Sequence, residues 1–451
     1  MALFGFAILA GIIAYLLLPE SMTESQRRMG AIFMVALVLW VSEAIPLFAT
    51  SLLVIVGQAW LLAIPELDVD IDFRDVFASL ANPIIYLFLG GFILAKGVQK
   101  QGIDVQMASV LLRPFGKTPY GVLAGIMLIT AVFSMWMSNT ATTAMMVVLV
   151  APLAAQIADT DNFRRGLVLG VPFAANIGGI GTPIGTPPNA IALAQLQQRG
   201  LEINFFEWMA FAVPLLFGTL ALMWLALLFI FKPQTKILEL QMPSTLEFNF
   251  KSWVVYFTFA VTVGLWLTTP LHGVDNAVVA MIPAAVFTIT QIISRQDFNR
   301  LEWDVLILMA GGIALGSGIT RTGLDVWIMG AFPFEDLSFF LLVAVCCVIT
   351  VFLSTIISNT VTANIVLPIG MALGAAFEDG HMIQVLAVMI AVSSSYAMGL
   401  PISTPPNVIA YGSGMVSSRN IMFVGGITSV VATVAIVTTG PSVVSFILGL
   451  F

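Results

Sequence analysis

Charged residues are scarce in this chain, and their scarcity excludes most soluble folds. Only 9% of the 451 residues are Asp, Glu, Lys or Arg, whereas a typical soluble domain contains roughly 25%. Hydrophobic residues make up 59% of the chain, and its mean hydropathy is +1.03. Because so few charges cannot coat a soluble protein of this length, we predict an all-α polytopic membrane protein.

Cysteine and histidine are nearly absent. Cys346 and Cys347 are neighbours in an apolar run, where we interpret them as packing residues, and His272 and His381 are isolated. No Ser/His pair, paired Asp or metal-ligand set falls inside the apolar runs. We therefore predict that the protein is not an enzyme and carries no cofactor. The net charge of −7 and the pI of 4.8 argue against a nucleic-acid partner.

What the chain has in abundance is apolar runs of about 20 residues, the length that crosses a bilayer. The first run, 3–18, is followed by no small-residue cleavage site, so we predict a membrane helix and not a signal peptide. In all we predict about eleven transmembrane helices, near 3–18, 30–46, 47–65, 83–101, 164–199, 210–231, 253–270, 275–294, 304–322, 382–413 and 420–449.

Two further apolar stretches, 119–158 and 338–377, are too long for one crossing, and each has a polar Ser-Asn-Thr in its middle. Polar residues at that depth need a protein-lined cavity, so we predict two re-entrant hairpins. With the N-terminus in the cytoplasm, 12 of the 17 Lys and Arg residues fall in cytoplasmic connections. Eleven crossings then place the C-terminus outside, and we predict a bacterial-type inner (plasma) membrane.

Three segments of the first half recur in the second half in the same order. The matches are Gly90, Gly91, Gly97, Gly102, Asp104 and Val105 with Gly311, Gly312, Gly318, Gly323, Asp325 and Val326; Ser134, Ser138, Asn139, Thr140 and Thr142 with Ser354, Ser358, Asn359, Thr360 and Thr362; and 183–192 with 401–410. The offsets are 221, 220 and 218 residues. Chance similarity between apolar segments hardly explains three ordered matches, so we predict an internal repeat.

Each repeat contains five crossings and one hairpin, and an odd number makes the second repeat enter the membrane from the opposite side. We therefore predict a first transmembrane helix outside the repeat (1–29), a first inverted repeat (30–232), a cytoplasmic linker (233–252) and a second inverted repeat (253–451). We interpret Asp104 and Asp325, which follow glycines near helix ends, as helix caps.

Both repeats contain a helix that cannot remain continuous. Three prolines and four glycines fall between Gly178 and Asn189, and three prolines and one glycine fall between Gly399 and Asn407. We predict broken helices over 164–199 and 382–413. A broken helix exposes carbonyls that suit a hard cation and amides that suit an anion. A plain proline kink is the alternative, and the symmetric pairing with polar hairpins argues against it.

The hairpin tips supply neutral oxygens, which suit sodium better than a divalent cation. Ser134 and Ser138 lie on one helical face and Asn139 follows them, so the broken-helix carbonyls would complete a shell. The predicted sodium sites are Ser134, Ser138, Asn139 and Gly185 in the first repeat, and Ser354, Ser358, Asn359 and Ser403 in the second. Hydroxyls bonding back to their own helix are the alternative.

Paired donors remain for an anion with a charge at each end. The predicted substrate-binding residues are Asn139, Thr140, Thr186, Pro187, Asn359, Thr360, Thr404 and Pro405. No Lys or Arg lies in these segments, so helix dipoles and bound cations must balance the charge. We therefore expect sodium to bind before the anion.

The two Ser-Asn-Thr tips and the two Pro-Pro-Asn loops, with Ser42-Glu43-Ala44-Ile45-Pro46, resemble the divalent anion/sodium symporter family over nearly the whole chain. The resemblance implies that each tip and its facing loop bind one sodium and one end of the substrate. It also implies a homodimer with a scaffold domain and a transport domain that moves as an elevator.

These features together predict sodium-coupled import of C4-dicarboxylates such as succinate, malate or fumarate. Sodium-coupled transport of sulfate or citrate, sodium-independent dicarboxylate exchange within the same family, and an anion channel remain alternatives.

Overall fold

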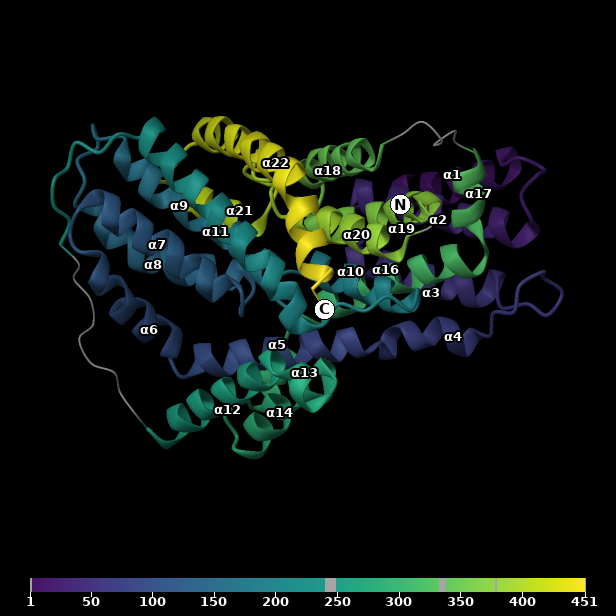
Figure 1. Cartoon of the computed structure of the whole chain (residues 1–451), viewed down its shortest axis with the longest axis horizontal. Helices are drawn as coiled ribbons and strands as arrows, with labels where there is room; N and C mark the ends of the chain where they lie inside the picture. The colour runs from purple at the N-terminus through teal and green to yellow at the C-terminus, as the bar shows by residue number, and fades with distance from the viewer. Residues whose placement is uncertain (1, 240–248, 332–337, 378, 451) are drawn as a thin grey trace.

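The computed structural model describes residues 2–239, 249–331, 338–377 and 379–450, and every regular element in this part of the chain is a helix (Figure 1). The α-helices are α1 (Ala2–Leu17), α2 (Glu24–Ser42), α3 (Leu47–Leu61), α4 (Phe73–Phe77), α5 (Pro83–Lys100), α6 (Ile103–Leu112), α7 (Pro119–Ser134), α8 (Asn139–Ala155), α9 (Phe163–Gly178), α10 (Pro187–Gln198), α11 (Phe205–Ile230), α12 (Phe250–Leu267), α13 (Thr269–His272), α14 (Asn276–Ile289), α15 (Arg295–Asn299), α16 (Trp303–Arg321), α17 (Leu324–Ala331), α18 (Phe339–Ile356), α19 (Asn359–Gly374), α20 (Gly380–Ser394), α21 (Pro405–Gly412) and α22 (Ser418–Leu448).

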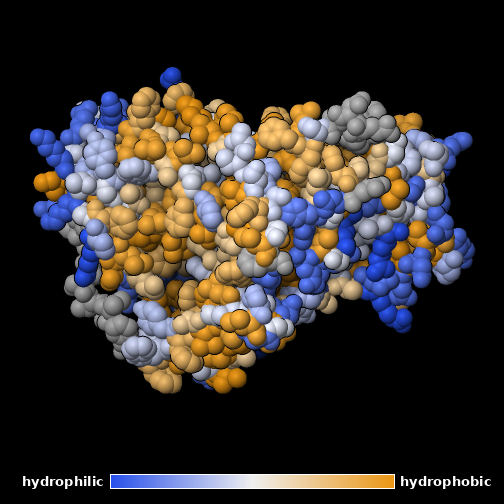
Figure 2. Space-filling view, viewed as in Figure 1, coloured by the Kyte–Doolittle hydropathy of each residue, from blue (hydrophilic) through white to orange (hydrophobic). Residues whose placement is uncertain are grey.

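The surface carries the apolar band that a membrane protein needs. Seven helical stretches of the described chain are long and apolar enough to cross a bilayer, and six shorter apolar helices accompany them. Figure 2 shows hydrophobic residues over the middle of the molecule and hydrophilic residues gathered mainly toward its left and right ends. The polytopic all-α prediction is confirmed, while the count of eleven crossings stays a prediction.

The predicted hairpins and broken helices each contain two helices. The segment 119–158 holds α7 and α8, and the segment 338–377 holds α18 and α19. The segment 164–199 holds α9 and α10, and 382–413 overlaps α20 and α21. Pro187 and Pro405 are the first residues of α10 and α21, where a missing N–H breaks no helical bond. Their placement in the bilayer stays a prediction.

Helix caps explain where two segments begin earlier than the apolar runs suggested. The helix predicted from residue 30 begins at Glu24, because Thr23 and Gln26 form a capping box. The helix predicted from residue 210 begins at Phe205, where Asn204 and Glu207 do the same. Hydropathy alone does not register the polar residues that form these capping boxes.

Two short helices, α6 and α17, were not predicted. They follow α5 and α16 after Gly102 and Gly323, which have φ angles of 64° and 67°. Glycine takes this left-handed conformation without a steric penalty, so it ends the long helix and redirects the chain. Gly102 is also the N-cap residue of α6, and Asp104 lies inside its first turn. The prediction that Asp104 caps a helix is therefore wrong.

Repeat-equivalent helices make equivalent contacts. α5 packs against α14, and α16 packs against α3. A Cβ atom at Gly90 of α5 would overlap the carbonyl of Ala280, and one at Gly311 of α16 would overlap Ser51. The recurring glycines therefore let each long helix approach its neighbour closely, which explains why they recur at the same offset.

Replacing Gly311 with Ala is expected to lower stability by about 1–3 kcal/mol, because the added methyl overpacks the α3–α16 contact. Thermal unfolding of the detergent-solubilised protein measures the effect. Gly264→Ala in α12 is the matched control, because nothing lies within 4 Å of the atom it adds. Equal melting temperatures for the two variants would contradict this account of the packing.

Two cross-repeat ion pairs also repeat. Lys100 at the end of α5 pairs with Asp297 of α15, and Arg321 at the end of α16 pairs with Asp75 of α4 at 2.8 Å. Lys100 and Arg321 are 221 residues apart, and Asp75 and Asp297 each complete the capping box of a short helix. Hydrogen bonds from Lys100 and Ser294 hold the pKa of Asp297 well below its usual range.

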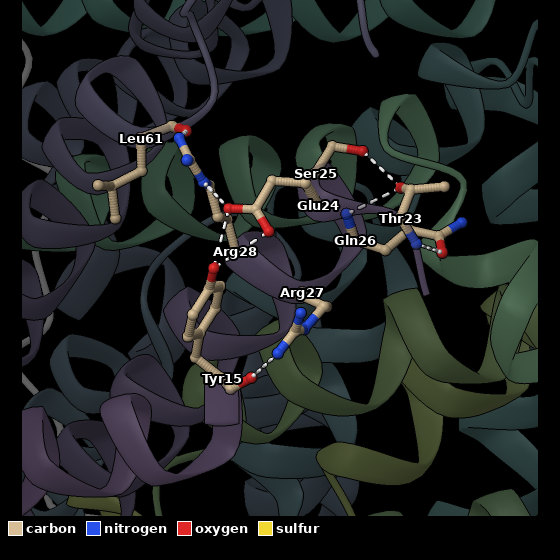
Figure 3. Close-up of polar contacts among 8 residues, drawn as sticks. All are labelled: Tyr15, Thr23, Glu24, Ser25, Gln26, Arg27, Arg28 and Leu61. Atoms are coloured by element: carbon tan, nitrogen blue, oxygen red, sulfur yellow. Dashed lines mark hydrogen bonds and ion pairs between the residues drawn. The ribbon is translucent and has the colours of Figure 1, made fainter. Parts of the chain in front are cut away.

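The first helix, outside the proposed repeat, is attached by a polar cluster at one end (Figure 3). Tyr15 of α1 donates its hydroxyl hydrogen bond to Glu24 of α2 at 3.0 Å. Glu24 also accepts from Arg28 at 2.7 Å, and Arg28 donates to the carbonyl of Leu61 in α3 at 3.0 Å. Arg27 donates to the Tyr15 carbonyl at 3.0 Å. One carboxylate thus links three helices.

The proposed linker 233–252 begins against the first hairpin, and its residues 240–248 lie outside the described chain. Asp161 accepts hydrogen bonds from the backbone of Phe163 and Gln234 and from the backbone and hydroxyl of Thr235. Burial alone raises the pKa of Asp161, but these hydrogen bonds outweigh it and lower the pKa. The start of the linker is thereby tied to the α8–α9 connection.

Candidate sodium and anion site

Three oxygen atoms meet at the turn of the first helix pair. The Ser134 hydroxyl, buried at the end of α7, lies 2.6 Å from Asn139 Oδ1 and 2.8 Å from the Ala175 carbonyl of α9. A hydroxyl has a single proton and can donate it to only one of these acceptors at a time. Whichever acceptor receives the proton, the serine oxygen and the other acceptor therefore face each other with no proton between them.

The second helix pair repeats this arrangement. The Ser354 hydroxyl lies 2.6 Å from Asn359 Oδ1 and 2.9 Å from the Ser394 carbonyl of α20. Ala175 and Ser394 were not among the predicted site residues, although Ala175 lies in the last turn of α9 and Ser394 is the last residue of α20. The Ala175 carbonyl also accepts a hydrogen bond from the backbone N–H of Gly179, and its second lone pair is left for Ser134. Ser394 lies at a helix end, where carbonyls lack an intrahelical partner. The repeat offset of about 220 residues was the signal that pairs them.

The remaining predicted sodium ligands have mixed positions. Ser138 and Ser358 are the N-cap residues of α8 and α19, and each hydroxyl accepts a backbone hydrogen bond, from Ala141 and Val361. Gly185 is buried in the first loop, where an added Cβ would overlap the Gly179 carbonyl. The loop therefore folds tightly back on itself at the position proposed to offer a carbonyl.

Each broken-helix loop is closed by the asparagine of its Pro-Pro-Asn motif. Asn189 Nδ2 donates to the carbonyls of Gly179 at 3.0 Å and Thr182 at 2.8 Å. Asn407 Nδ2 donates to the carbonyls of Met398 at 3.2 Å and Leu400 at 2.9 Å. The motif was used to predict the loops, yet neither asparagine was named as a site residue. Their side chains fix which loop carbonyls remain free.

The Oδ1 atoms of Asn189 and Asn407 are buried and have no hydrogen-bond partner in the described protein. A buried amide oxygen without a partner is unfavourable by about 1–3 kcal/mol. The same feature at both repeat-equivalent positions indicates that each loop retains an oxygen available to a ligand or water.

Hydroxyl groups tie each loop to the facing hairpin turn. Thr182 donates to the Met135 carbonyl, and Ser403 donates to the Thr355 carbonyl at 2.8 Å. Met135 and Thr355 are repeat equivalents, whereas Thr182 and Ser403 are not. The two halves therefore keep the same contact with differently placed hydroxyls.

The first half of one broken helix contacts the loop of the other. Asn176 near the end of α9 donates its amide hydrogen bond to the Thr404 hydroxyl in the second loop, at 3.1 Å. Both residues are buried. This bond joins the first repeat to the second at the centre of the proposed site.

The predicted substrate-binding threonines differ in exposure. Thr140 is exposed and Thr360 is half-buried, each in the first turn of its helix. Thr186 and Thr404 are buried N-cap residues of α10 and α21. The Thr404 hydroxyl accepts from Asn176, whereas no hydrogen bond of the Thr186 side chain is formed among the described residues. The first-turn N–H groups of four helices thus follow the predicted residues.

Charged residues adjoin the first turn, which the sequence did not predict. A cavity of about 90 Å³ is lined by Ser138 together with Lys96 of α5 and Arg300 and Glu302 before α16. The repeat equivalent of Lys96 is Ser317, so this positive charge has no counterpart in the second repeat. Lys96 and Arg300 bring two positive charges to this side of the site, which favour an anion, while Glu302 and the nearby Asp304 offset them.

An apolar groove of about 560 Å³ lies elsewhere, between α1, α2 and α3. It is lined mainly by aliphatic residues and contains none of the repeated motif residues. A dianion needs convergent donors, so this groove is not the anion site.

Comparison with known proteins identifies the family. The family model for the sodium:sulfate symporter transmembrane region matches residues 1–449. The sodium-dependent dicarboxylate transporter SdcS of Staphylococcus saprophyticus is 30% identical over 473 residues, covering 96% of this chain and 89% of its own. The sodium-dependent high-affinity dicarboxylate transporter 3 of Caenorhabditis elegans is 30% identical over 453 residues, covering 87% of this chain and 78% of its own.

Solved structures agree on the fold. The YdaH transporter of Alcanivorax borkumensis superposes with a TM-score of 0.62 at 13% identity, covering 90% of this chain and 99% of its own. MtrF of Neisseria gonorrhoeae superposes with a TM-score of 0.56 at 14% identity, covering 96% and 97%. Because the family model spans nearly the entire chain, the protein belongs to the sodium:sulfate symporter family, the divalent anion/sodium symporters that its repeated motifs resemble, and it is a membrane transporter and not an enzyme.

Proposed function

We propose that the protein couples sodium entry to the import of divalent anions, with C4-dicarboxylates such as succinate, malate or fumarate as substrates. The observation that carries the proposal is the duplicated cluster of three oxygens around Ser134 and Ser354. Convergent neutral oxygens suit a monovalent hard cation, which would take the place of the missing proton between them. The named relatives are sodium-dependent dicarboxylate transporters, which supports the same function here.

In this proposal each cluster holds one sodium ion. The first site comprises Ser134, Ser138, Asn139 and Gly185, and the Ala175 carbonyl joins them. The second comprises Ser354, Ser358, Asn359 and Ser403, and the Ser394 carbonyl joins them. A bound sodium accepts lone pairs from the serine and asparagine oxygens together, so it draws each hairpin turn toward its broken helix.

The anion binds between the two sites, one carboxylate at each. The amides of Asn139 and Asn359 direct their oxygens to sodium and leave their N–H groups for the anion. The helix N-termini that follow Thr140, Thr186, Thr360 and Thr404 supply further donors. Pro187 and Pro405 begin two of these helices and shape the surface beside the donors. Two sodium ions balance the two charges of the dicarboxylate, so sodium binds first.

Transport requires the shared site to open on each side in turn. Two inverted repeats, 30–232 and 253–451, provide two arrangements of similar energy, because each repeat can adopt the conformation of the other. We place the protein in a bacterial-type inner membrane as a homodimer, with its N-terminus cytoplasmic and its C-terminus outside. The transport domain of the elevator comprises the two helix pairs and the two broken helices.

Succinate uptake into proteoliposomes tests the proposal. An inward sodium gradient is expected to drive saturable uptake against a succinate gradient, and uptake is expected to fall to the leak rate when potassium replaces sodium. Equal uptake with and without the sodium gradient would contradict sodium coupling and would support sodium-independent dicarboxylate exchange instead. Uncoupled, non-saturating current would instead indicate an anion channel. Competition by sulfate and by citrate distinguishes the substrate classes.

A further inference from the structure

Two repeat-equivalent carboxylates have different environments. Asp104 of α6 and Asp325 of α17 are 221 residues apart, and each is 5% exposed. Arg199, at the end of α10, donates to Asp325 at 2.9 Å and to the Thr320 hydroxyl at 3.1 Å. This guanidinium joins a broken helix to the helix that follows α16, and it is itself mostly buried.

Asp104 has the same surroundings in the sequence but lacks the ion pair. Its Oδ1 atom is buried and has no hydrogen-bond partner in the described protein. The residue equivalent to Thr320 is Gln99, whose amide oxygen is also an acceptor. The first repeat therefore has equivalents of both acceptors that Arg199 contacts, but no arginine lies beside them. Backbone N–H groups of Asp104 and Val105 are hydrogen-bond partners of this carboxylate, but it forms no ion pair among the described residues. A buried carboxylate without a cation is unfavourable unless another arrangement supplies one.

One set of helix contacts also differs between the repeats. The cross-repeat pairs of Lys100 and Arg321 are formed on both sides. By contrast, α10 and α19 pack against α16, whereas their equivalents α21 and α8 have no comparable packing against α5 in the described chain. α17 packs against α19, while α6 packs mainly against α7 (Figure 1). The hairpins and broken helices therefore sit closer to one repeat's long helix than to the other's.

Arg419 is the cation of the second half that corresponds in chain order to Arg199. Arg199 is the first basic residue after the first broken helix, and Arg419 is the first after the second. Arg419 is also the sole Lys or Arg after Arg321. It lies in the first turn of α22, is exposed, and forms no hydrogen bond or ion pair among the described residues. A guanidinium fork suits a carboxylate and an amide oxygen side by side.

We propose that Asp104 and Gln99 form the docking site for Arg419 in the opposite transport state, where this contact replaces the one between Asp325 and Arg199. The proposal rests on the proposed transport function with inverted repeats. When the two repeats exchange conformations, α21 and α22 take the place that α10 and α11 now hold, and Arg419 reaches α6. Each end state then has one buried ion pair, formed by either Asp104 or Asp325, and the remaining carboxylate has no arginine partner in that state.

The exchange keeps the two states close in energy. If only one transport state had a buried ion pair, the free energy of that pair would favour this state. The equilibrium between the two states would then lie far toward it. Alternating the pairs removes this bias. Asp104 is a positioning residue in this scheme, because it contacts neither sodium nor the anion.

Cysteine cross-linking tests the contact directly. In a background in which Cys346 and Cys347 are replaced by Ala, Asp104→Cys with Arg419→Cys is treated with a short bifunctional thiol reagent in proteoliposomes. We expect cross-linking of this pair and also of Asp325→Cys with Arg199→Cys, because the protein visits both states. Asp104→Cys with Met422→Cys, one turn further along α22, is the control expected to cross-link less. Cross-linking of the pair Asp325→Cys with Arg199→Cys, without cross-linking of Asp104→Cys with Arg419→Cys, would overturn the proposal.

Charge exchange provides a second measurement. Asp104→Asn or Arg419→Gln is expected to slow uptake at least about 5-fold by biasing the states, while the sodium-dependent rise in melting temperature is retained. Asp104→Arg combined with Arg419→Asp is expected to restore uptake. The ion pair of the exposed Asp159 with the half-buried Arg164 supplies control variants, Asp159→Asn and Arg164→Gln. Wild-type uptake in both single variants, or no recovery in the double variant, would overturn the proposal.

The two tests separate this inference from the proposed function. Cross-linking needs no knowledge of the substrate, so it still reports the Asp104–Arg419 contact if succinate is not carried. Sodium-driven succinate uptake by the wild type together with absent cross-linking would contradict the alternating ion pair alone.

Discussion

Replacing Asn139 or Asn359 with Ala is expected to reduce sodium-driven uptake by at least about 10- to 100-fold, the range found when groups that organise a metal site are removed. Each asparagine oxygen lies 2.6 Å from a buried serine hydroxyl, so its loss opens one side of the proposed sodium shell. The sodium-dependent rise in melting temperature should shrink in parallel, because saturation at 100 times Kd stabilises a protein by about 2.7 kcal/mol per site.

The isosteric variant Asn139→Asp separates the two roles of this side chain. A carboxylate keeps an oxygen for sodium and adds a charge that strengthens the site, so sodium-dependent stabilisation is expected to persist. The same charge repels a dianion and removes the N–H donors, so succinate uptake is expected to be lost. Asn249→Ala, at the N-cap of α12, is a control for loss of an asparagine at a helix start. Wild-type transport by Asn139→Ala or Asn359→Ala would contradict the site assignment.

Much of the fold follows from hydropathy, glycine and proline. Apolar runs predicted the long helices, and the Pro-Pro-Asn motifs predicted that the chain breaks between α9 and α10 and between α20 and α21. The boundaries of α2 and α11 depend on capping boxes, which polar residues form and which a hydropathy reading passes over. α6 and α17 are short, but the recurrence of Gly102 and Asp104 as Gly323 and Asp325 was a signal that an element follows.

The predicted site was built from residues of the motif segments, and the assignment of sodium ligands stays a prediction. The hydroxyls of Ser134 and Ser354 lie 2.6 Å from Oδ1 of Asn139 and Asn359. What the sequence left out came from other helices. The Ala175 and Ser394 carbonyls belong to residues whose side chains carry no motif, so only the repeat offset relates them. Lys96 reaches the first turn from α5, and Arg199 reaches Asp325 from α10. Contacts between segments far apart in the chain depend on packing, which the order of residues does not reveal.

Replacing Asn189 or Asn407 is expected to have the second large effect, because one amide group closes each loop. Asn189 Nδ2 holds the carbonyls of Gly179 and Thr182, and their loss of a donor is unfavourable by about 1–3 kcal/mol for each buried group. Asn189→Ala should therefore lower both the melting temperature and the sodium-dependent shift. Asn189→Asp should be equally harmful, because a carboxylate in place of the donor repels the same carbonyls.

The expected effect of Asn189→Asp differs from that of Asn139→Asp, which retains sodium binding. The difference distinguishes an asparagine that holds the loop closed from one that binds sodium. Asn364→Ala is the matched control, since Asn364 is a buried asparagine that donates only to the Leu308 carbonyl at 3.2 Å, outside both loops. It should lower the melting temperature and leave the sodium-dependent shift intact. If Asn189→Asp keeps the full shift while Asn189→Ala loses it, the asparagine acts through its oxygen, and Asn189 belongs among the ligands of the site.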